Sequence, residues 1–113
     1  MEERISRKPY IVSREFNESR KNIYEYSVYR FGYFQAEHYK QKIRKSLDTL
    51  PDFYNAYPEC RHLATKSRMY RNIILDAHLI IYRITDKRIE VLDIIHSASS
   101  IRKIRNSRNI HLI

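Results

Sequence analysis

The sequence predicts an α+β domain: an N-terminal strand, then a helical hairpin packed on one face of an antiparallel sheet, in the order β-α-α-β-β-β with a short basic C-terminal tail. Two observations lead to this fold class. Apolar residues recur at helical spacing in the first half of the chain, and three β-branched runs fill much of the second half. The length of 113 residues predicts a single domain over residues 1–113, with a core over 9–97 and the tail over 98–113.

The N-terminal residues predict a strand followed by the first helix of the hairpin. Residues 9–13 are PYIVS, and Pro9 suits the first position of a strand because its nitrogen cannot donate a hydrogen bond. We expect Asn17 to be the N-cap of the following helix, since its side chain can accept from the first free amides. Gly32, the only glycine in the chain, is expected to end that helix with a positive φ.

A regular apolar stripe predicts the second helix. Its members are spaced by three or four residues, as on one face of an α-helix: Ala36, Tyr39, Ile43, Leu47 and Leu50. Pro51 is expected to stop this helix, because proline lacks the N–H that another turn requires. Two helices joined at Gly32 make an antiparallel hairpin whose apolar side needs a sheet to cover it.

Three apolar runs predict a meander of antiparallel strands. They read MYRNIIL, HLIIYRI and RIEVLDIIH, and the breaks between them are short, one at 76–77 and one around 86–87. Connections this short join neighbouring antiparallel strands. The tail that follows reads ASSIRKIRNSRNIHLI and predicts a short helix beginning after Ser97 or Ser99.

Side-chain alternation decides which polar groups of the sheet can meet. On the last run, one face is shared by Glu90, Leu92, Ile94 and His96. Arg83 and His96 share a face if the register of the 86–87 turn brings them there, and they point apart if it slips by one residue. We expect the curved sheet to gather the arginines into a single cationic surface.

The charge balance indicates the kind of partner. There are 22 Lys and Arg residues against 13 Asp and Glu, which gives a formal net charge of +9. Such a chain is attracted to polyanions, a group that includes nucleic acid, ribosomes, acidic proteins and anionic lipid. Charge alone does not choose among them.

The cysteine and histidine content indicates a chain without metal or cofactor. Cys60 is the only cysteine, so an internal disulfide and a cysteine-rich zinc site are excluded. The five histidines are scattered with no i, i+4 pair. We therefore expect no metal and no cofactor. The N-terminus lacks the apolar segment of a signal peptide and no run is long enough to span a membrane, so a reducing cytoplasm is the expected setting.

The order of these segments resembles the RelE/ParE toxins of bacterial type II toxin–antitoxin systems, also known as plasmid stabilization proteins. The resemblance covers residues 9–97 and depends on four stretches taken together: YIVS, IRKSLDTLP, YPECRHL and YRNIILDAHLIIYRITDKRIEVLDIIHS. It implies a cytoplasmic basic toxin that inhibits growth and is neutralised by a cognate antitoxin. That antitoxin is expected to be short, acidic and encoded next to this gene, with a heterotetramer as one form of the complex.

Two activities are found in the family that the chain resembles. ParE-like members block DNA gyrase and have no chemistry of their own, whereas RelE-like members cleave mRNA in the ribosomal A site. The nuclease branch tends to carry an aromatic residue just after the last strand. Here His96 and Ser97 are followed by ASSIRKI, which contains no aromatic residue. We therefore favour a ParE-like gyrase inhibitor, with the RelE-like endoribonuclease as the alternative.

Two sets of residues are candidates for function. RNA cleavage without metal needs acid–base groups and cations aimed at the phosphate, and the catalytic candidates are Lys66, Arg68, Arg71, Arg83 and His96. The structural alternatives are a partly solvated strand end for His96 and ion pairs with Asp76, Asp93 or Glu90 for the sheet arginines. An amphipathic antitoxin helix needs apolar contacts, and the candidates are Tyr24, Tyr26, Phe31, Phe34, Phe53 and Tyr54.

Overall fold

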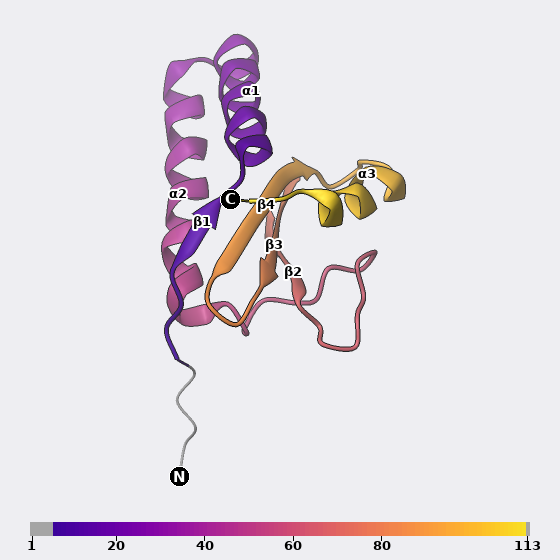
Figure 1. Ribbon diagram of the computed structural model, residues 1–113. Helices are drawn as coiled ribbons and strands as arrows, with labels where there is room; N and C mark the ends of the chain where they lie inside the picture. The colour runs from indigo at the N-terminus through magenta and orange to yellow at the C-terminus, as the bar shows by residue number, and fades with distance from the viewer. Residues whose placement is uncertain (1–5, 113) are drawn as a thin grey trace.

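A helical hairpin covers one face of a four-stranded sheet, and a short C-terminal helix covers the other (Figure 1). The computed structural model describes residues 6–112. In chain order the elements are β1 (Tyr10–Val12), α1 (Arg14–Phe31), α2 (Tyr33–Phe53), β2 (Tyr70–Leu75), β3 (His78–Ile84), β4 (Ile89–His96), α3 (Ile101–Asn106) and a 3₁₀ turn η1 (Ser107–Asn109). The predicted α+β class and element order are confirmed.

The sheet is mixed rather than purely antiparallel. Strands β2, β3 and β4 form the predicted antiparallel meander, but β1 pairs in parallel with β4, and the strand order is β1-β4-β3-β2. The backbone of Ile89 donates to Pro9 O at 2.9 Å, and that of Ser13 donates to Val91 O at 2.9 Å. The long excursion through the hairpin and β2–β3 allows β4 to return in the direction of β1.

Helix α1 begins three residues before the predicted N-cap. Ser13 is the cap: its backbone is extended and its Oγ accepts from the amide of Phe16 at 2.9 Å. The same hydroxyl donates to the carbonyl of Leu92, which ties the start of α1 to β4. Asn17 lies inside the helix, where its side chain accepts from Arg20. The prediction of Asn17 was wrong because Ser13 satisfies the first amides earlier in the chain.

The two helices meet at Gly32, which has the predicted positive φ of 94°. Helix α2 does not stop at Pro51, as predicted, but continues to Phe53. A proline removes only its own N–H, so one further turn can form when its ring is buried against the core. Pro51 is buried, and its carbonyl accepts from the backbone of Lys8 at 3.1 Å.

Two apolar clusters lie on the two faces of the sheet. The cluster under the hairpin consists of Phe16, Ile43, Leu47, Leu50, Tyr54, Ile73, Leu75, Ile80, Tyr82, Ile89, Val91 and Ile94. The cluster on the opposite face consists of Cys60, Leu63, Ile81, Leu92, Ile95 and Ile104, with Ile110 and Leu112 packed against it. The C-terminal tail is therefore an ordered part of the domain. Ser100 caps its helix, accepting from the amide of Lys103 at 3.2 Å.

Candidate functional site

A β-bulge in β4 decides where its polar residues point. Ile81 pairs with Asp93 and Tyr82 pairs with Val91, so β4 carries one extra residue at Leu92. The bulge shifts the alternation by one, and Asp93 reaches Ser19 of α1, whose hydroxyl donates to it at 2.7 Å. Val91 and Ile94 consequently share the face under the hairpin, which contradicts the predicted alternation.

Arg83 and His96 lie on opposite faces of the sheet. Arg83 faces the C-terminal tail, whereas His96 stands across from His78 at the far end of β3, on the hairpin side. His78 and Arg83 are five residue steps apart on an extended strand, roughly 17 Å at the usual rise. These two candidates therefore do not share a site: the turn places Arg83 opposite Glu90, and the bulge at Leu92 then moves His96 to the other face.

Arg83 is part of a buried ion network. Its Nε and Nη2 donate to Glu90 Oε1 at 2.9 and 2.6 Å, and Arg88 donates to Glu90 Oε2 at 2.8 Å. Although burial acts in the opposite direction, hydrogen bonds from these two arginines lower the pKa of Glu90. Both arginines also donate to backbone carbonyls of the tail. Arg83 donates to Ile110 O and Arg88 donates to Leu112 O, each at 3.3 Å. The predicted ion-pair alternative with Glu90 is confirmed for Arg83.

The other cationic candidates surround the start of β2. Arg71 faces the hairpin side of the sheet, in register with Tyr82, and donates to the carbonyls of Tyr57 and Asn55 at 2.8 and 3.2 Å. Arg68 pairs with Glu59 at 3.2 Å, while Lys66 is exposed. Since Arg71 and Arg83 occupy opposite faces, the expected single cationic surface does not form.

His96 lies beside two residues that were not predicted to be functional, His78 and Tyr39. The ring of His78 packs edge-on against that of His96, with 5.6 Å between ring centres. Tyr39 Oη of α2 lies 2.7 Å from His78 Nδ1. This group could have been predicted from the sequence. Short turns between antiparallel strands place the first residue of β3 at the same end of the sheet as the last residue of β4.

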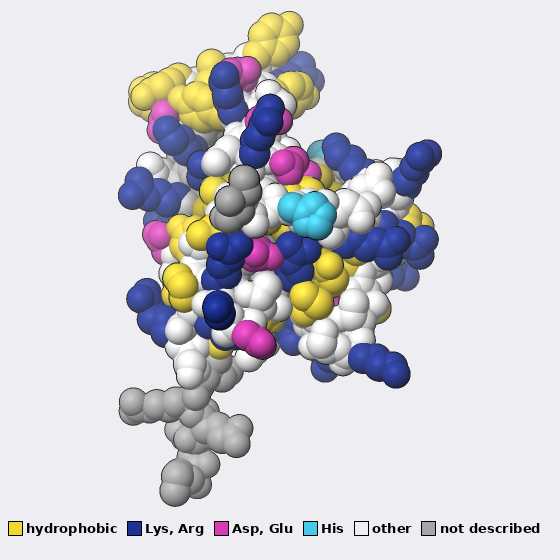
Figure 2. Space-filling model, viewed as in Figure 1, with side chains coloured by type: hydrophobic (Ala, Val, Ile, Leu, Met, Phe, Trp, Pro, Cys, Tyr) yellow, Lys and Arg dark blue, Asp and Glu magenta, His cyan; other side chains and the backbone are white. Residues whose placement is uncertain are grey.

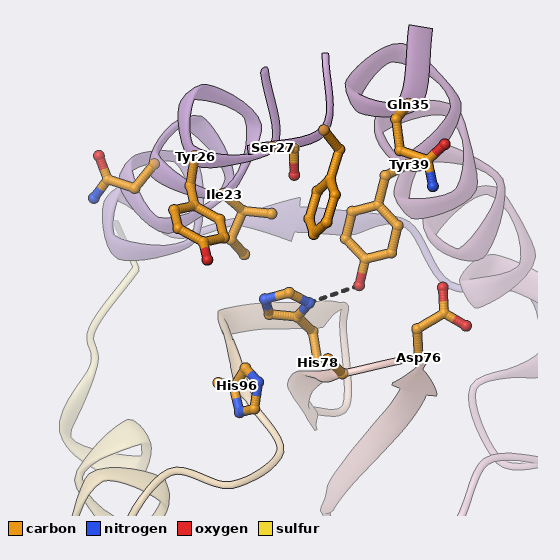
Figure 3. Close-up of a pocket in the computed structure, with 11 residues that line it drawn as sticks. Ile23, Tyr26, Ser27, Gln35, Tyr39, Asp76, His78 and His96 are labelled. Atoms are coloured by element: carbon orange, nitrogen blue, oxygen red, sulfur yellow. Dashed lines mark hydrogen bonds between the residues drawn. The ribbon is translucent and has the colours of Figure 1, made fainter. Parts of the chain in front are cut away.

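These three side chains line a pocket of about 590 Å³ between the hairpin and the end of the sheet. In Figure 3 Ile23 and Tyr26 of α1 lie on one side of the pocket, and His78 and His96 lie on the other. The remaining lining residues are Asn22, Ser27, Phe31, Gln35, Asp76 and Ala77. Burial lowers the pKa of His78, His96 lowers it further, and Asp76 acts in the opposite direction.

The end of the hairpin carries exposed aromatic rings, seen as the apolar cap at the top of Figure 2. We call this surface the hairpin tip: Tyr26, Tyr29, Phe31, Tyr33 and Phe34, all at least 60% exposed. It contains three of the predicted antitoxin contacts together with two residues that the prediction omitted, Tyr29 and Tyr33.

The other three predicted aromatic contacts lie elsewhere. Tyr24 is half-buried, and its hydroxyl donates to Glu37 at 2.7 Å. Phe53 is exposed but stands at the opposite end of α2. Tyr54 is only 4% exposed and belongs to the core, with its hydroxyl bonded to Ser6 O. The six rings therefore do not line one groove, because the hairpin separates its tip from the end of α2.

The remaining chemistry of the described chain is sparse. Cys60 is buried, and burial raises the pKa of its thiol. Across residues 6–112 no three groups of the metal-binding types lie close enough together to hold an ion. No helix within the same range has the length and apolar content to cross a bilayer.

Comparison with known proteins gives two findings. A family model described as "ParE toxin of type II toxin-antitoxin system, parDE" matches residues 10–101. A solved structure from the chromosomal ParDE toxin–antitoxin system of P. aeruginosa is 19% identical and superposes with a TM-score of 0.67, covering 81% of this chain and 98% of that one. No curated protein matches the chain.

Proposed function

We propose that this chain, which belongs to the ParE toxin family of type II toxin–antitoxin systems, arrests bacterial growth by blocking DNA gyrase and is neutralised by a cognate antitoxin. Its action would take place in the cytoplasm, where gyrase works. The family membership covers residues 10–101, which include every strand and both helices of the hairpin.

The main observation against a nuclease is that the candidate catalytic groups lie far apart. Phosphoryl transfer to a ribose hydroxyl needs an acid–base pair and a cation within contact of one phosphate. Here His96 lies at one end of the sheet and Arg83 at the other, on opposite faces. Arg83 is also engaged by Glu90, and Arg71 by loop carbonyls. A protein that acts by binding requires no such cluster.

Neutralisation by an acidic partner is supported by charge and by the hairpin tip. The net charge of +9 attracts an acidic chain and accelerates its association. The five exposed rings of the hairpin tip offer apolar contacts of the kind that an amphipathic helix covers. We propose that the antitoxin covers this tip.

The gyrase proposal is tested with the purified full-length chain in a supercoiling assay. We expect it to inhibit ATP-dependent supercoiling of relaxed plasmid by gyrase, and the antitoxin added in equal amount to restore it. Expression without antitoxin should arrest growth and induce DNA-damage signalling while mRNA stays intact. Codon-specific cuts in primer extension within minutes, with normal supercoiling, would support the RelE-like endoribonuclease instead. Absence of growth arrest would overturn both.

The antitoxin contact is tested by co-purification with the product of the neighbouring short acidic reading frame. We expect Phe31→Ala/Phe34→Ala to weaken the complex at least tenfold, because large aromatic rings supply much of an interface's binding energy. Phe53→Ala is the matched control, since its ring is exposed to a similar degree, 57% against 62% for Phe31. The mass of the complex decides between a heterodimer and a heterotetramer. Equal effects of the tip and control variants would place the antitoxin elsewhere.

A further inference from the structure

The hydrogen bonds around the two pocket histidines engage Nδ1 of each ring and leave Nε2 for a ligand. Tyr39 Oη lies 2.7 Å from His78 Nδ1 and 3.3 Å from Leu75 O, and its single proton can go to either acceptor. In His96, Nδ1 accepts from the backbone amide of Ala98 at 3.0 Å, so the neutral ring carries its proton on Nε2. His78 carries a proton on Nε2 whenever its ring is protonated. With His78 protonated, both histidines present an N–H donor at Nε2.

These two donors line a pocket whose other walls are largely apolar. In Figure 3 the nitrogen of His78 that does not face Tyr39 is turned toward the side where Ile23 and Tyr26 lie. Among the residues that the structure describes, no lysine or arginine lines the pocket. Its one carboxylate, Asp76, is already neutralised by Lys42, whose Nζ lies 2.9 and 3.0 Å from the two oxygens. The two imidazoles are the titratable donors of the pocket, and they lie beside apolar walls and the neutral polar side chains of Asn22, Ser27 and Gln35.

An acceptor with an apolar body matches this arrangement. A carboxylate accepts two N–H groups at once, and its attraction to imidazole grows when either ring becomes protonated. An aromatic or aliphatic side chain next to that carboxylate would contact Ile23, Tyr26 and Phe31. The net charge of +9 also favours an anionic ligand over a neutral or cationic one.

We propose that this pocket binds a carboxylate carried beside an apolar side chain on a peptide segment of the antitoxin, with His96 donating from Nε2 and His78 donating from Nε2 in its protonated form. The assignment of the segment to the antitoxin rests on the proposed function. The chemistry of the pocket, in which two imidazoles bind one carboxylate, does not depend on the proposed function. The pocket adjoins the hairpin tip through Tyr26 and Phe31, so one acidic amphipathic segment can reach both.

Binding of a carboxylate here is coupled to a proton. The groups that face His78 are Tyr39 and the Lys42–Asp76 pair from α2 and the β2–β3 turn, His96 from β4, and Tyr26 across the pocket. In the free protein burial lowers the pKa of His78, and the positive charge of a protonated His96 lowers it further. A bound carboxylate adds the opposite charge and raises this pKa. The complex therefore takes up protons, and affinity rises as pH falls from 8 to 6.

The test uses the full-length chain and two small probes, 3-phenylpropionate and its uncharged analogue 3-phenylpropionamide. Histidine ring signals are followed by NMR during each titration at pH 6 and pH 8. We expect the carboxylate to shift the signals of His78 and His96 and to leave those of His111, which is exposed outside the pocket, unchanged. Its affinity should be about tenfold higher at pH 6, as one added charge–charge hydrogen bond implies. The amide should bind more weakly and equally at both pH values.

Variants separate donation from titration. His78→Gln keeps a side-chain N–H donor but cannot be protonated, so we expect the carboxylate still to bind while most of the pH dependence is lost. His96→Gln provides a second variant, and His111→Gln is the matched control that retains the wild-type profile. Circular dichroism confirms that each variant is folded. Equal binding of both probes, or a pH dependence that survives in both pocket variants, would overturn the proposal.

The same variants distinguish this proposal from the proposed function. If the antitoxin neutralises the toxin but its affinity is unaffected by His78→Gln and His96→Gln at pH 6 and 8, the pocket assignment fails and the function stands. If the probes show the expected selectivity but gyrase is not inhibited and no antitoxin binds, the proposed function fails and the pocket chemistry stands. Loss of antitoxin affinity confined to the pocket variants at pH 6 supports both.

Discussion

Arg83 Nη2 lies 2.6 Å from Glu90 Oε1, on the sheet face that the C-terminal tail covers. Both side chains are largely buried, 14% and 10% exposed, and both connect the meander to the tail through Arg88 and the tail carbonyls. A guanidinium in this position contributes to the stability of the domain and is withdrawn from solvent. This relationship explains why a conspicuous arginine in a basic sequence is a structural residue.

Removing the carboxylate of this pair is expected to destabilise the protein strongly. Glu90→Gln leaves two guanidinium groups without their anion, and breaking a buried pair from one side costs about 3 kcal/mol. Glu18→Gln is the control, because its pair with Arg14 is exposed on α1 and is worth less than about 0.5 kcal/mol. Urea unfolding followed by circular dichroism measures both. Similar small losses would show that the tail-side network contributes little.

The stability contribution of Glu90 has a defined pH dependence. Because the folded protein lowers the pKa of Glu90 below the ordinary value of 4.5, its contribution is present above that pH and is lost as pH falls through the folded-state pKa. The difference in unfolding free energy between wild type and Glu90→Gln should therefore shrink in acid. A difference that stays constant down to pH 3 would contradict this assignment.

His78 is expected to make the protein less stable in mild acid. Its pKa is lower in the folded state than in the unfolded chain, whose value is near 6.5, so below that pH the unfolded chain binds a proton that the folded one rejects. Stability is full above pH 6.5 and declines as pH falls toward 5. His78→Gln should flatten this decline in thermal unfolding, whereas His111→Gln should leave it unchanged. An identical decline in the two variants would assign it to other groups.

Glycine is expected to be required at position 32 because of its backbone conformation and not because a side chain would clash there. Its φ of 94° and ψ of 169° lie in a region that essentially only glycine adopts, yet a Cβ placed there would meet no atom within 4 Å. Gly32→Ala should therefore cost about 1–3 kcal/mol through backbone strain without any clash. Gln41→Ala, at an exposed position of α2, is the control and should change stability by less than about 0.5 kcal/mol. Thermal unfolding measures the two.

The C-terminal helix is expected to stabilise the whole domain. Ile104 is 5% exposed against the outer sheet face, while Ile101 of the same helix is 48% exposed. Ile104→Ala should lower the unfolding free energy by about 2–4 kcal/mol, because it leaves a cavity between α3 and the sheet. Ile101→Ala should change it little. Equal unfolding midpoints in urea for the two variants would show that the tail detaches without affecting the core.

Much of the fold followed from local patterns. The stripe from Ala36 to Leu50 predicted α2, the lone glycine predicted the hairpin turn, and short breaks between apolar runs predicted the β2–β3–β4 meander. Each pattern reflects a constraint within a few neighbouring residues, such as helical periodicity or the limited geometry of a short turn. The family could be recognised for the same reason, since the chain resembles it in the order and spacing of these segments.

Only part of the candidate site could be predicted from the sequence. His96 was identified from its place at the end of a strand, but its partners Tyr39 and His78 come from α2 and from the opposite end of a neighbouring strand. Tyr29 and Tyr33 were passed over because exposure depends on what packs against each ring. Ser13 is the N-cap of α1 in place of Asn17, and its hydroxyl also contacts β4. No pattern among neighbouring residues predicts that contact.

By itself the sequence determined which segments become helices and strands, in what order, and with what net charge, because these properties depend on neighbouring residues and composition. The tertiary structure decided which side chains meet. One extra residue at Leu92 placed Arg83 and His96 on opposite faces, and the parallel return of β4 beside β1 turned an antiparallel meander into a mixed sheet. Register and pairing are set by a partner strand and by the packed face, so they exist only once distant parts of the chain are in contact.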